Sequence, residues 1–437
     1  MEGFSGAPSQ SSHGVIAARY QRPGTELFFT FGINVLGRKG MREQKGLSPR
    51  QRILRTFQRK RIDRIAWQPR IYYWYYGNRL ENKLPEGYED RELLDSFYEN
   101  IQSYNGDVPE EYKDKTMLEI YDNLKALPRY PQEVLGVSLF RMEIDSRRVK
   151  CITKVEKGER VTIYETPLGT LREVTRHGYH TEYPVKTPQD MRVMRYILDS
   201  NEFRFDAHAF DVAERTFRER APVQSFYPRS PLQRLIIAYM GFENTIYALN
   251  DHPREIHDLL RAIEEWDDVM YEVILNSPLE ILNFGENIDA NIDSPKLFEE
   301  YFLPYYKKRC DQIHRSGKFC HIHMDGSLNP LLPLINEAGF DGIEAATPSP
   351  QGDVTLEELK DALGDTILID GIPAILFLPE QPQEQLEAFT TRILEMFSPN
   401  LILGVSDELP PTADIERVTL VSKIVGDFKP YPDSSGG

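Results

Sequence analysis

The sequence predicts an α/β fold, a (β/α)8 barrel with a β-hairpin excursion and N-terminal helical elements. One strand–helix–strand unit, at residues 317–348, has short apolar runs that end near His323 and Glu344. From Leu279 onward strands and helices alternate, and the strands are continuously apolar, as parallel strands covered on both faces are. A barrel needs about 250 residues, and the 437-residue chain has room for one.

Seven stretches of the chain have strand character. They lie at residues 65–71, 221–227, 279–284, 318–323, 341–346, 366–370 and 401–405. Helical patterns surround them at residues 49–60, 90–104, 109–127, 188–198, 230–250, 253–276, 294–314, 328–338, 356–363, 380–397 and 413–425. The first helix has Ser48 at its cap and Pro49 in its first turn. Since no G-x-G-x-x-G motif and no P-loop occur, the pattern disfavours the dinucleotide-binding folds.

Composition excludes several classes of protein. The formal net charge is -16, so a nucleic-acid partner is not expected, because phosphate binding needs a basic surface. The three cysteines, Cys151, Cys310 and Cys320, are too few for a disulfide framework and favour the cytoplasm. No apolar run approaches the roughly 20 residues that a bilayer requires, so no membrane association is expected.

Domain organisation is expected to be simple. Residues 1–40 are rich in Gly, Ser and Arg without a sustained period, which predicts a disordered N-terminal arm or an upstream in-frame extension. Residues 41–437 are then a single barrel domain. Alternating runs around a Lys-Gly turn at residues 157–158 place the β-hairpin excursion at residues 148–185, on the barrel and not in a separate domain.

Acidic and histidine side chains follow the late strands. In a barrel the carboxyl ends of the strands share one rim, where active sites lie. His323 and Asp325 are two residues apart, which spans roughly 7 Å in a strand, so both could reach one metal. His321 is too far from Asp325 to share that metal easily and is expected behind the site or in the core. The alternative for His323 is a hydrogen-bonded core histidine. The rim candidates are Glu286, Asp289, His323, Asp325, Glu344, Asp370 and Asp407.

Aromatic residues follow the first strand. Arg70 precedes the run at residues 72–76, which is either a packed aromatic cluster or the wall of a pocket for a large flat or anionic ligand. On the second interpretation Arg70 and Tyr72 are catalytic. Substrate contacts are then expected from Trp67, Trp74, Asp289 and Asp370.

Several motifs resemble the uroporphyrinogen decarboxylase superfamily, which also contains cobalamin-dependent methyltransferases. The resemblance covers roughly residues 48–425, and its fold is a (β/α)8 barrel. A further segment, Thr166-Pro-Leu-Gly169, is similar to the hairpin of the methyltransferase-like branch. The motifs are Ser294-Pro295 through Leu303-Pro304-Tyr305-Tyr306, then His314-x-x-Gly317-Lys318, His323-Met324-Asp325-Gly326 and Glu337-Ala338-Gly339-Phe340-Asp341.

The departures from the family pattern concern the metal ligands. Zinc methyltransferases of the superfamily carry H-x-C-G and a later cysteine, whereas this chain has Asp325 and Asp407 at those positions. His323, Asp325 and Asp407 can still hold a divalent metal, with Glu286 or Glu344 as fourth ligand or general base. Zinc is expected, and the harder oxygen ligands also admit manganese or magnesium.

A second departure concerns substrate binding. The arginine-rich M-R-Q-A-G-R segment of true uroporphyrinogen decarboxylases is replaced by Gln68-Pro69-Arg70-Ile71-Tyr72, and only Arg70 and Arg79 remain nearby. A tetrapyrrole with eight carboxylates needs more positive charge, so porphyrin decarboxylation is not favoured.

Three hypotheses follow for the function. The first is metal-dependent transfer of a methyl group between a small donor and a corrinoid carrier on a separate protein, since no corrinoid-binding segment is visible. The second is a metal-independent decarboxylase (a lyase) that acts on a carboxylated substrate through Arg70, Tyr72 and the rim acids. The third is a binding barrel without turnover. The resemblance also implies a homodimer.

Overall fold

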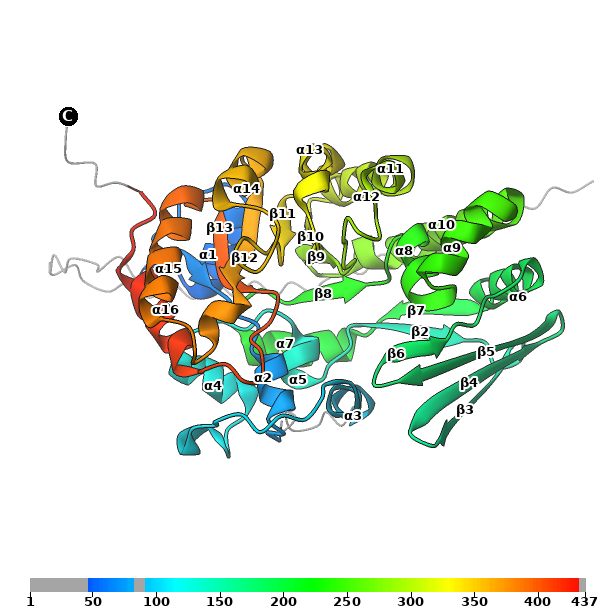
Figure 1. Ribbon diagram of the computed structural model, residues 1–437, viewed down its shortest axis with the longest axis horizontal. Coiled ribbons are helices and arrows are strands. Elements are labelled where there is room, and N and C mark those ends of the chain that lie inside the picture. Colours follow the sequence, from blue (N-terminus) through cyan, green and yellow to red (C-terminus); the bar gives the residue numbers. More distant parts are fainter. Residues whose placement is uncertain (1–45, 82–90, 432–437) are drawn as a thin grey trace, which may run out of the picture. The chain divides into compact units, whose positions relative to one another are not determined.

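A curled parallel sheet of seven strands forms the centre of the fold, in the order β1-β13-β12-β11-β10-β9-β8 (Figure 1). The computed structural model describes residues 46–81 and 91–431; the predicted arm at residues 1–40 lies outside them. Every neighbouring pair in this sheet is parallel. The strands are β1 Ala66–Trp67, β8 Gln224–Tyr227, β9 Ile281–Phe284, β10 Phe319–His323, β11 Gly342–Glu344, β12 Ile367–Pro373 and β13 Leu401–Ser406.

An extended segment at residues 127–130 occupies the eighth position, between β1 and β8. Its Leu127 N–H donates to the Trp67 carbonyl at 2.9 Å, and the Gln68 side chain donates to the Pro128 carbonyl at 2.8 Å. On the other side, the Tyr130 ring lies 4.2 Å from that of Phe226 in β8. Pro128 has no N–H to donate, so the segment cannot form a regular ladder. The predicted barrel fold is confirmed, with an irregular eighth strand.

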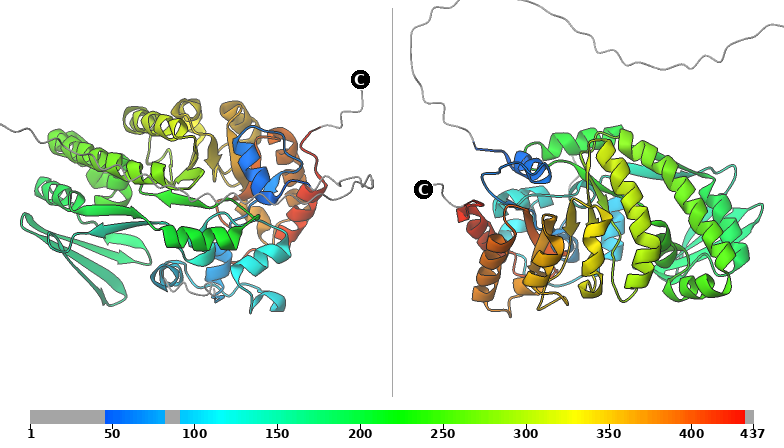
Figure 2. Two further views of the ribbon diagram at one scale, coloured as in Figure 1. Left: turned by 180° about the vertical axis from the view of Figure 1, so that it is seen from behind. Right: turned by 90° about the horizontal axis from the view of Figure 1, so that it is seen from above.

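The helices lie outside the parallel sheet and around it (Figures 1 and 2). They are α1 Pro49–Phe57, α2 Tyr72–Gly77, α3 Arg91–Asn100, α4 Met117–Leu124, α5 Pro131–Leu135, α6 Pro188–Leu198, α7 Ala207–Phe217, α8 Pro231–Arg234, α9 Phe242–Asp251, α10 Pro253–Asn276, α11 Pro295–Leu297, α12 Leu303–Arg315, α13 Leu332–Ile335, α14 Leu356–Leu363, α15 Gln383–Phe397 and α16 Glu416–Asp427. Among the described residues, no helix is both long and apolar enough to span a membrane.

Local sequence signals account for several helix starts. At α1 the Ser48 hydroxyl accepts from the Gln51 N–H while the Gln51 side chain accepts from the Ser48 N–H, which is the predicted cap completed as a capping box. Two predicted helices are shorter than their patterns. Thr116 caps α4, so helix begins there and not at residue 109. Pro330 and Pro333 interrupt the pattern at residues 328–338, which becomes α13 between two 3₁₀ turns.

Burial follows the predicted pattern. Every residue of β9, β11, β12 and β13 is buried, as expected for parallel strands covered on both faces. Because side chains alternate along a strand, alternate positions point into the barrel, and several of these inward residues are polar. They are Gln224, Asn283, His321, Glu344 and Asp370.

The predicted β-hairpin excursion is a four-stranded antiparallel sheet (Figure 1). Its strands are β3 Lys150–Glu156, β4 Glu159–Thr166, β5 Gly169–Arg176 and β6 Tyr179–Glu182. A separate antiparallel pair, β2 Phe140–Ile144 with β7 Asn201–Phe205, flanks it. Sequence patterns did not predict this pair, because its two strands lie far apart in the chain and are joined only by tertiary contact.

Gly404 in β13 lies in a closely packed part of the barrel interior. A Cβ at Gly404 would lie 2.0 Å from Asp370 Oδ1 and 3.0 Å from the Gln68 carbonyl oxygen. Gly404→Ala should therefore lower the free energy of unfolding by about 1–3 kcal/mol, measured by chemical denaturation. Gly426→Ala in α16 is the matched control, since no atom lies within 4 Å of the added Cβ, and it should raise stability by about 0.5–1 kcal/mol. Equal effects of the two substitutions would contradict this picture of the interior.

Candidate active site

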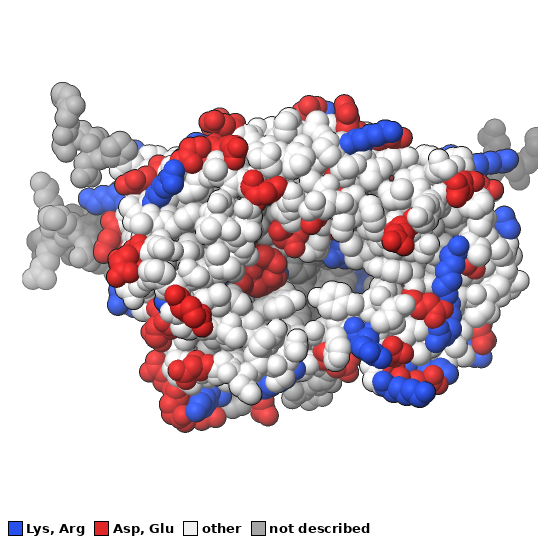
Figure 3. All heavy atoms as spheres, viewed as in Figure 1, with Lys and Arg blue, Asp and Glu red and all other residues white. Residues whose placement is uncertain are grey.

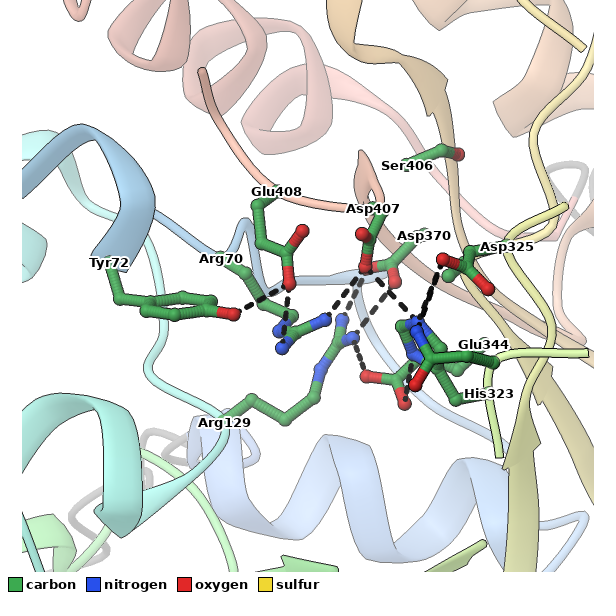
Figure 4. A network of polar contacts seen from close by, with 12 residues as sticks. Arg70, Tyr72, Arg129, His323, Asp325, Glu344, Asp370, Ser406, Asp407 and Glu408 are labelled. Atoms are coloured by element: carbon green, nitrogen blue, oxygen red, sulfur yellow. Dashed lines mark hydrogen bonds and ion pairs between the residues drawn. The ribbon is translucent and has the colours of Figure 1, made fainter. Parts of the chain in front are cut away.

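One histidine and two carboxylates meet at the rim formed by the carboxyl ends of β10 and β13 (Figure 4). His323 ends β10, Asp325 follows two residues later, and Asp407 directly follows β13. His323 Nε2 lies 3.3 Å from Asp407 Oδ1 and 3.9 Å from Asp325 Oδ2. One ligand atom from each of the three residues lies within 4.8 Å of the others. The structure thus brings together the three residues that the sequence proposed as metal ligands.

Glu344 at the end of β11 lies against the other nitrogen of the His323 ring. The distance from His323 Nδ1 to Glu344 Oε2 is 3.4 Å, so a proton on Nδ1 leaves Nε2 facing Asp325 and Asp407. Burial disfavours the charged imidazole, but Asp407, Asp325 and Glu344 outweigh it and raise the pKa of His323 well above its ordinary value. Glu344 therefore acts as the orienting partner of this histidine.

Arg129 neutralises Glu344 from inside the barrel. Its Nη1 donates to Glu344 Oε1 at 2.6 Å and its Nη2 donates to Asp370 Oδ1 at 2.6 Å, and all three side chains are at most 1% exposed. Burial alone would raise the pKa of Glu344, but its contacts with His323 and Arg129 hold that pKa well below the ordinary value. Asp370 has a φ of 81°, a strained conformation for a residue other than glycine, and the ion pair with Arg129 holds it.

Arg70 lies on the far side of Asp407. Its guanidinium contacts Glu133 Oε1 at 2.6 Å, Asp407 Oδ1 at 3.0 Å and Glu408 Oε1 at 3.0 Å. The Tyr72 hydroxyl donates to Glu408 at 2.8 Å. Burial raises the pKa of Glu133 to about 7, although the positive charge of Arg70 acts to lower it. Arg70 and Tyr72 therefore stand beside the cluster, as the sequence suggested, but their polar groups are already engaged by acids.

The two carboxylates of the cluster reach solvent, whereas the histidine is nearly enclosed. Asp325 and Asp407 keep 27% and 30% of their side-chain surface exposed, whereas His323 keeps 7%. Figure 3 shows a hollow near the middle of the face seen in Figure 1, with acidic side chains along one side of it. A small molecule or ion can therefore approach the two carboxylates while the histidine stays enclosed.

Comparison with known proteins places the chain in a family. The sequence model of the family described as uroporphyrinogen decarboxylase (URO-D) matches residues 170–428. The chain belongs to the uroporphyrinogen decarboxylase family. The resemblance predicted from the sequence motifs is thereby confirmed.

One solved structure supports the barrel fold. A methyltransferase from Methanosarcina mazei superposes with a TM-score of 0.54 at 12% identity, covering 87% of this chain and 99% of that one. At this identity the likeness shows the fold alone. A B12-independent methionine synthase from Shewanella sp. W3-18-1 in complex with selenomethionine has a TM-score of 0.41 at 11% identity, covering 83% of this chain and 95% of that one. A search of curated proteins finds no match.

Three other predicted site residues, Glu286, Asp289 and Asp370, are not members of the three-residue cluster. Glu286 accepts from the N–H and hydroxyl of Ser230 and anchors the start of α8, so it is not a neighbour of the cluster in the described contacts. Asp289 binds the Asn291 backbone N–H and lies against Gly326, next to Asp325. Asp370 is enclosed with Arg129 and offers no surface to a substrate.

The two tryptophans are core residues and not part of the cluster. Gln68 points into the barrel, so its neighbour Trp67 points outward and lines a groove beside α1 and α16. Trp74 packs edge-on against Tyr112 and is fully buried. Helix α2 begins directly after Ile71, which turns Tyr72 towards Glu408 and Trp74 into the core. The structure thus places Trp67 and Trp74 outside the cluster, and their role in substrate binding stays a prediction.

Sequence reasoning did not identify Arg129, Tyr130, Glu133, Asn283 and Glu408. The Tyr130 hydroxyl donates to Glu344, and Asn283 donates to both, so these side chains complete the polar interior. Two signals were present. Arg129 and Tyr130 stand between Pro128 and Pro131, a context that favours extended backbone. Asn283 is a polar residue inside a buried apolar strand, which is uncommon without a partner.

Removing the guanidinium of Arg129 should be strongly destabilising. Arg129→Met leaves Glu344 and Asp370 buried without a counter-charge, which should lower the free energy of unfolding by about 3–5 kcal/mol in denaturant titrations. Arg147→Met is the matched control, because Arg147 is 88% exposed and pairs only with Asp145; its effect should stay below about 1 kcal/mol. Similar losses in both variants would rule out a central role for the buried ion pair.

Glu286 should make stability depend on pH. Burial raises its pKa from 4.5 to about 7, against the hydrogen bonds from Ser230. Because the folded state binds this proton more tightly, the stabilisation is complete below pH 4.5 and is lost as pH rises through about 7. Glu286→Gln removes the titrating carboxyl group. The free energy of unfolding of this variant should therefore rise by about 3 kcal/mol relative to that of the natural protein between pH 4.5 and 7. Parallel stability curves from denaturation at each pH would refute the assignment.

Proposed function

We propose that this chain is a metal-dependent methyltransferase of the uroporphyrinogen decarboxylase superfamily. It moves a methyl group between a small donor and a corrinoid carrier on a separate protein. In the direction of the corrinoid, the bond between the methyl carbon and the donor heteroatom breaks and the heteroatom takes up a proton. The reduced corrinoid supplies the electron pair of the new bond to carbon.

The excess of negative charge around the cluster is the observation that carries the metal part of the proposal. Two arginines, Arg70 and Arg129, lie in the network of ion pairs around His323, together with a larger number of acids. The acids of this network are Asp325, Glu344, Asp370 and Asp407, with Glu133 and Glu408, whose pKa values burial raises. Buried charges need counter-charges, and the arginines already face carboxylates. The site therefore suits a cation, and an anionic substrate would have to displace an existing ion pair.

The donor set also fits a divalent metal. His323 Nε2, Asp325 and Asp407 would hold it, because imidazole and carboxylate are zinc ligands, and manganese or magnesium suit the oxygen donors. The contact between His323 and Glu344 is the carboxylate–histidine arrangement that commonly orients a metal-binding imidazole. A bound metal would supply Lewis-acid chemistry, lowering the pKa of an acceptor or polarising a methoxy or amine donor.

Other residues have supporting roles in this proposal. Arg70 holds the Asp407 carboxylate towards His323, and Tyr72 with Glu408 forms the adjoining wall. The partial exposure of Asp325 and Asp407 leaves room for the donor on the solvent side, while the enclosed His323 and Glu344 are kept from water.

Metal content decides the first part of the proposal. His323→Ala and Asp407→Ala should each lose one equivalent of bound metal relative to the natural protein, measured by elemental analysis of the purified full chain. Glu286→Gln is the matched carboxylate control and should keep its metal, since Glu286 binds Ser230 instead. Full retention of metal in both the His323 and the Asp407 variants would refute the site.

The visible spectrum of a cobalamin acceptor, followed with methoxy and amine donors, then reports methyl transfer.

A metal-independent decarboxylase is the second candidate, and Arg229 is the observation that favours it. The guanidinium of Arg229 donates to Asn287 Oδ1 at 2.8 Å and to the Glu286 carbonyl at 3.3 Å, which are uncharged oxygens. Asp325 is among the acids near it. A substrate carboxylate could bind there. Protein that purifies without metal and releases carbon dioxide from a carboxylated substrate would support this candidate over methyl transfer.

A further inference from the structure

A second group of metal-binding side chains lies at the opposite ends of β10 and β11. Cys320 is the second residue of β10, and Asp341 directly precedes β11. Because His321 points into the barrel, Cys320 points outward, towards helix α12. That helix contributes His314 and Cys310, which are four residues apart and therefore lie on one face. The group thus sits between the sheet and its outer helix, away from the rim that carries His323.

The side chains of this group are close enough to share one ion. His314 Nε2 lies 2.9 Å from Asp341 Oδ2 and 4.0 Å from Cys320 Sγ. One ligand atom from each of these three residues lies within 4.8 Å of the others. Cys310 Sγ lies 3.6 Å from Cys320 Sγ.

We propose that His314, Cys320 and Asp341 form a second divalent-metal site. The combination of sulfur, imidazole and carboxylate favours zinc over magnesium or calcium, which prefer oxygen. Three protein ligands would leave one position of a tetrahedral ion open to water. The site is independent of the proposed methyl transfer.

Access also suits a metal site. His314 and Asp341 keep 41% and 19% of their side-chain surface exposed, so an ion can reach the buried thiols from this side. Metal ligands bind in their deprotonated forms, so metal binding is best measured in alkaline buffer.

Such a site would fasten α12 to the two strands that hold the candidate active site. β10 carries His323 at its other end, and β11 carries Glu344. The Cys320 N–H already donates to Asp341 Oδ2 at 2.8 Å, which joins the starts of these strands. A metal at this position would add coordination bonds between helix and sheet. Its removal should therefore lower the thermal midpoint of unfolding.

Cobalt binding distinguishes this site from the one at the rim. The metal-free, reduced full chain is titrated with Co²⁺, and a sulfur-to-cobalt charge-transfer band is followed in the near ultraviolet. The proposed ligands His323, Asp325 and Asp407 contain no sulfur, so this band reports only the second site. We expect the band in the natural protein and in His323→Ala, which makes failure of the rim site separable from failure of this one.

Three variants complete the test. Cys320→Ser should lose the band and one equivalent of cobalt, and His314→Gln, at the exposed end, should weaken cobalt binding at least tenfold. Cys151→Ser is the matched control, because Cys151 is exposed in β3, and it should keep the band. If Cys320→Ser does not fold, the cobalt affinity of His314→Gln tests the proposal. Absence of the band from the reduced natural protein, its survival in Cys320→Ser, or unchanged affinity in His314→Gln would overturn the proposal. Conversion of Cys310 and Cys320 to a disulfide, with no metal bound by the reduced form, would also overturn it.

Discussion

The buried guanidinium of Arg129 is the constraint on which the rest of the barrel interior depends. A charge that is 1% exposed must be neutralised, and Arg129 meets Glu344 from β11 and Asp370 from β12. Because the ion pairs join two strands to the irregular segment at residues 127–130, they hold together the part of the barrel where regular backbone pairing is absent. Glu344 then orients His323, so the same interaction that stabilises the interior also sets the geometry at the rim.

From this interior the site becomes progressively more open and more acidic. Arg129, Glu344 and Asp370 are enclosed, His323 is nearly so, and Asp325 and Asp407 reach solvent. Enclosed groups can hold a fixed orientation, because each has a partner and no competing water. Exposed carboxylates can exchange a ligand. This division accounts for a cluster that combines a rigid imidazole with accessible oxygen donors.

The two proposed metal sites occupy opposite ends of β10 and β11. The rim, at the carboxyl ends of the strands, is the face where barrels carry their chemistry, and the other face usually serves stability. The ligand types follow the same division: imidazole with oxygen at the rim, and imidazole with sulfur and oxygen at the other end. In this member of the uroporphyrinogen decarboxylase family, aspartates stand at the rim, while the two buried cysteines, Cys310 in α12 and Cys320 in β10, lie at the other end.

The sequence by itself determined the alternation of strands and helices after Leu279, the cap at Ser48 and the barrel, because apolar periodicity and capping are local properties. It also indicated His323, Asp325 and Asp407, since acids after apolar strands reach one rim of a barrel. Asp407 and Glu286 both follow strands, so the sequence alone does not distinguish them. Only the tertiary structure shows that Asp407 lies beside His323, whereas Glu286 accepts a hydrogen bond from Ser230. It alone revealed Arg129, whose carboxylate partners are more than 200 residues away in the chain. Local sequence patterns determine on which face of a strand or helix a side chain lies, whereas the pairing of buried charges depends on how the sheet closes into a barrel.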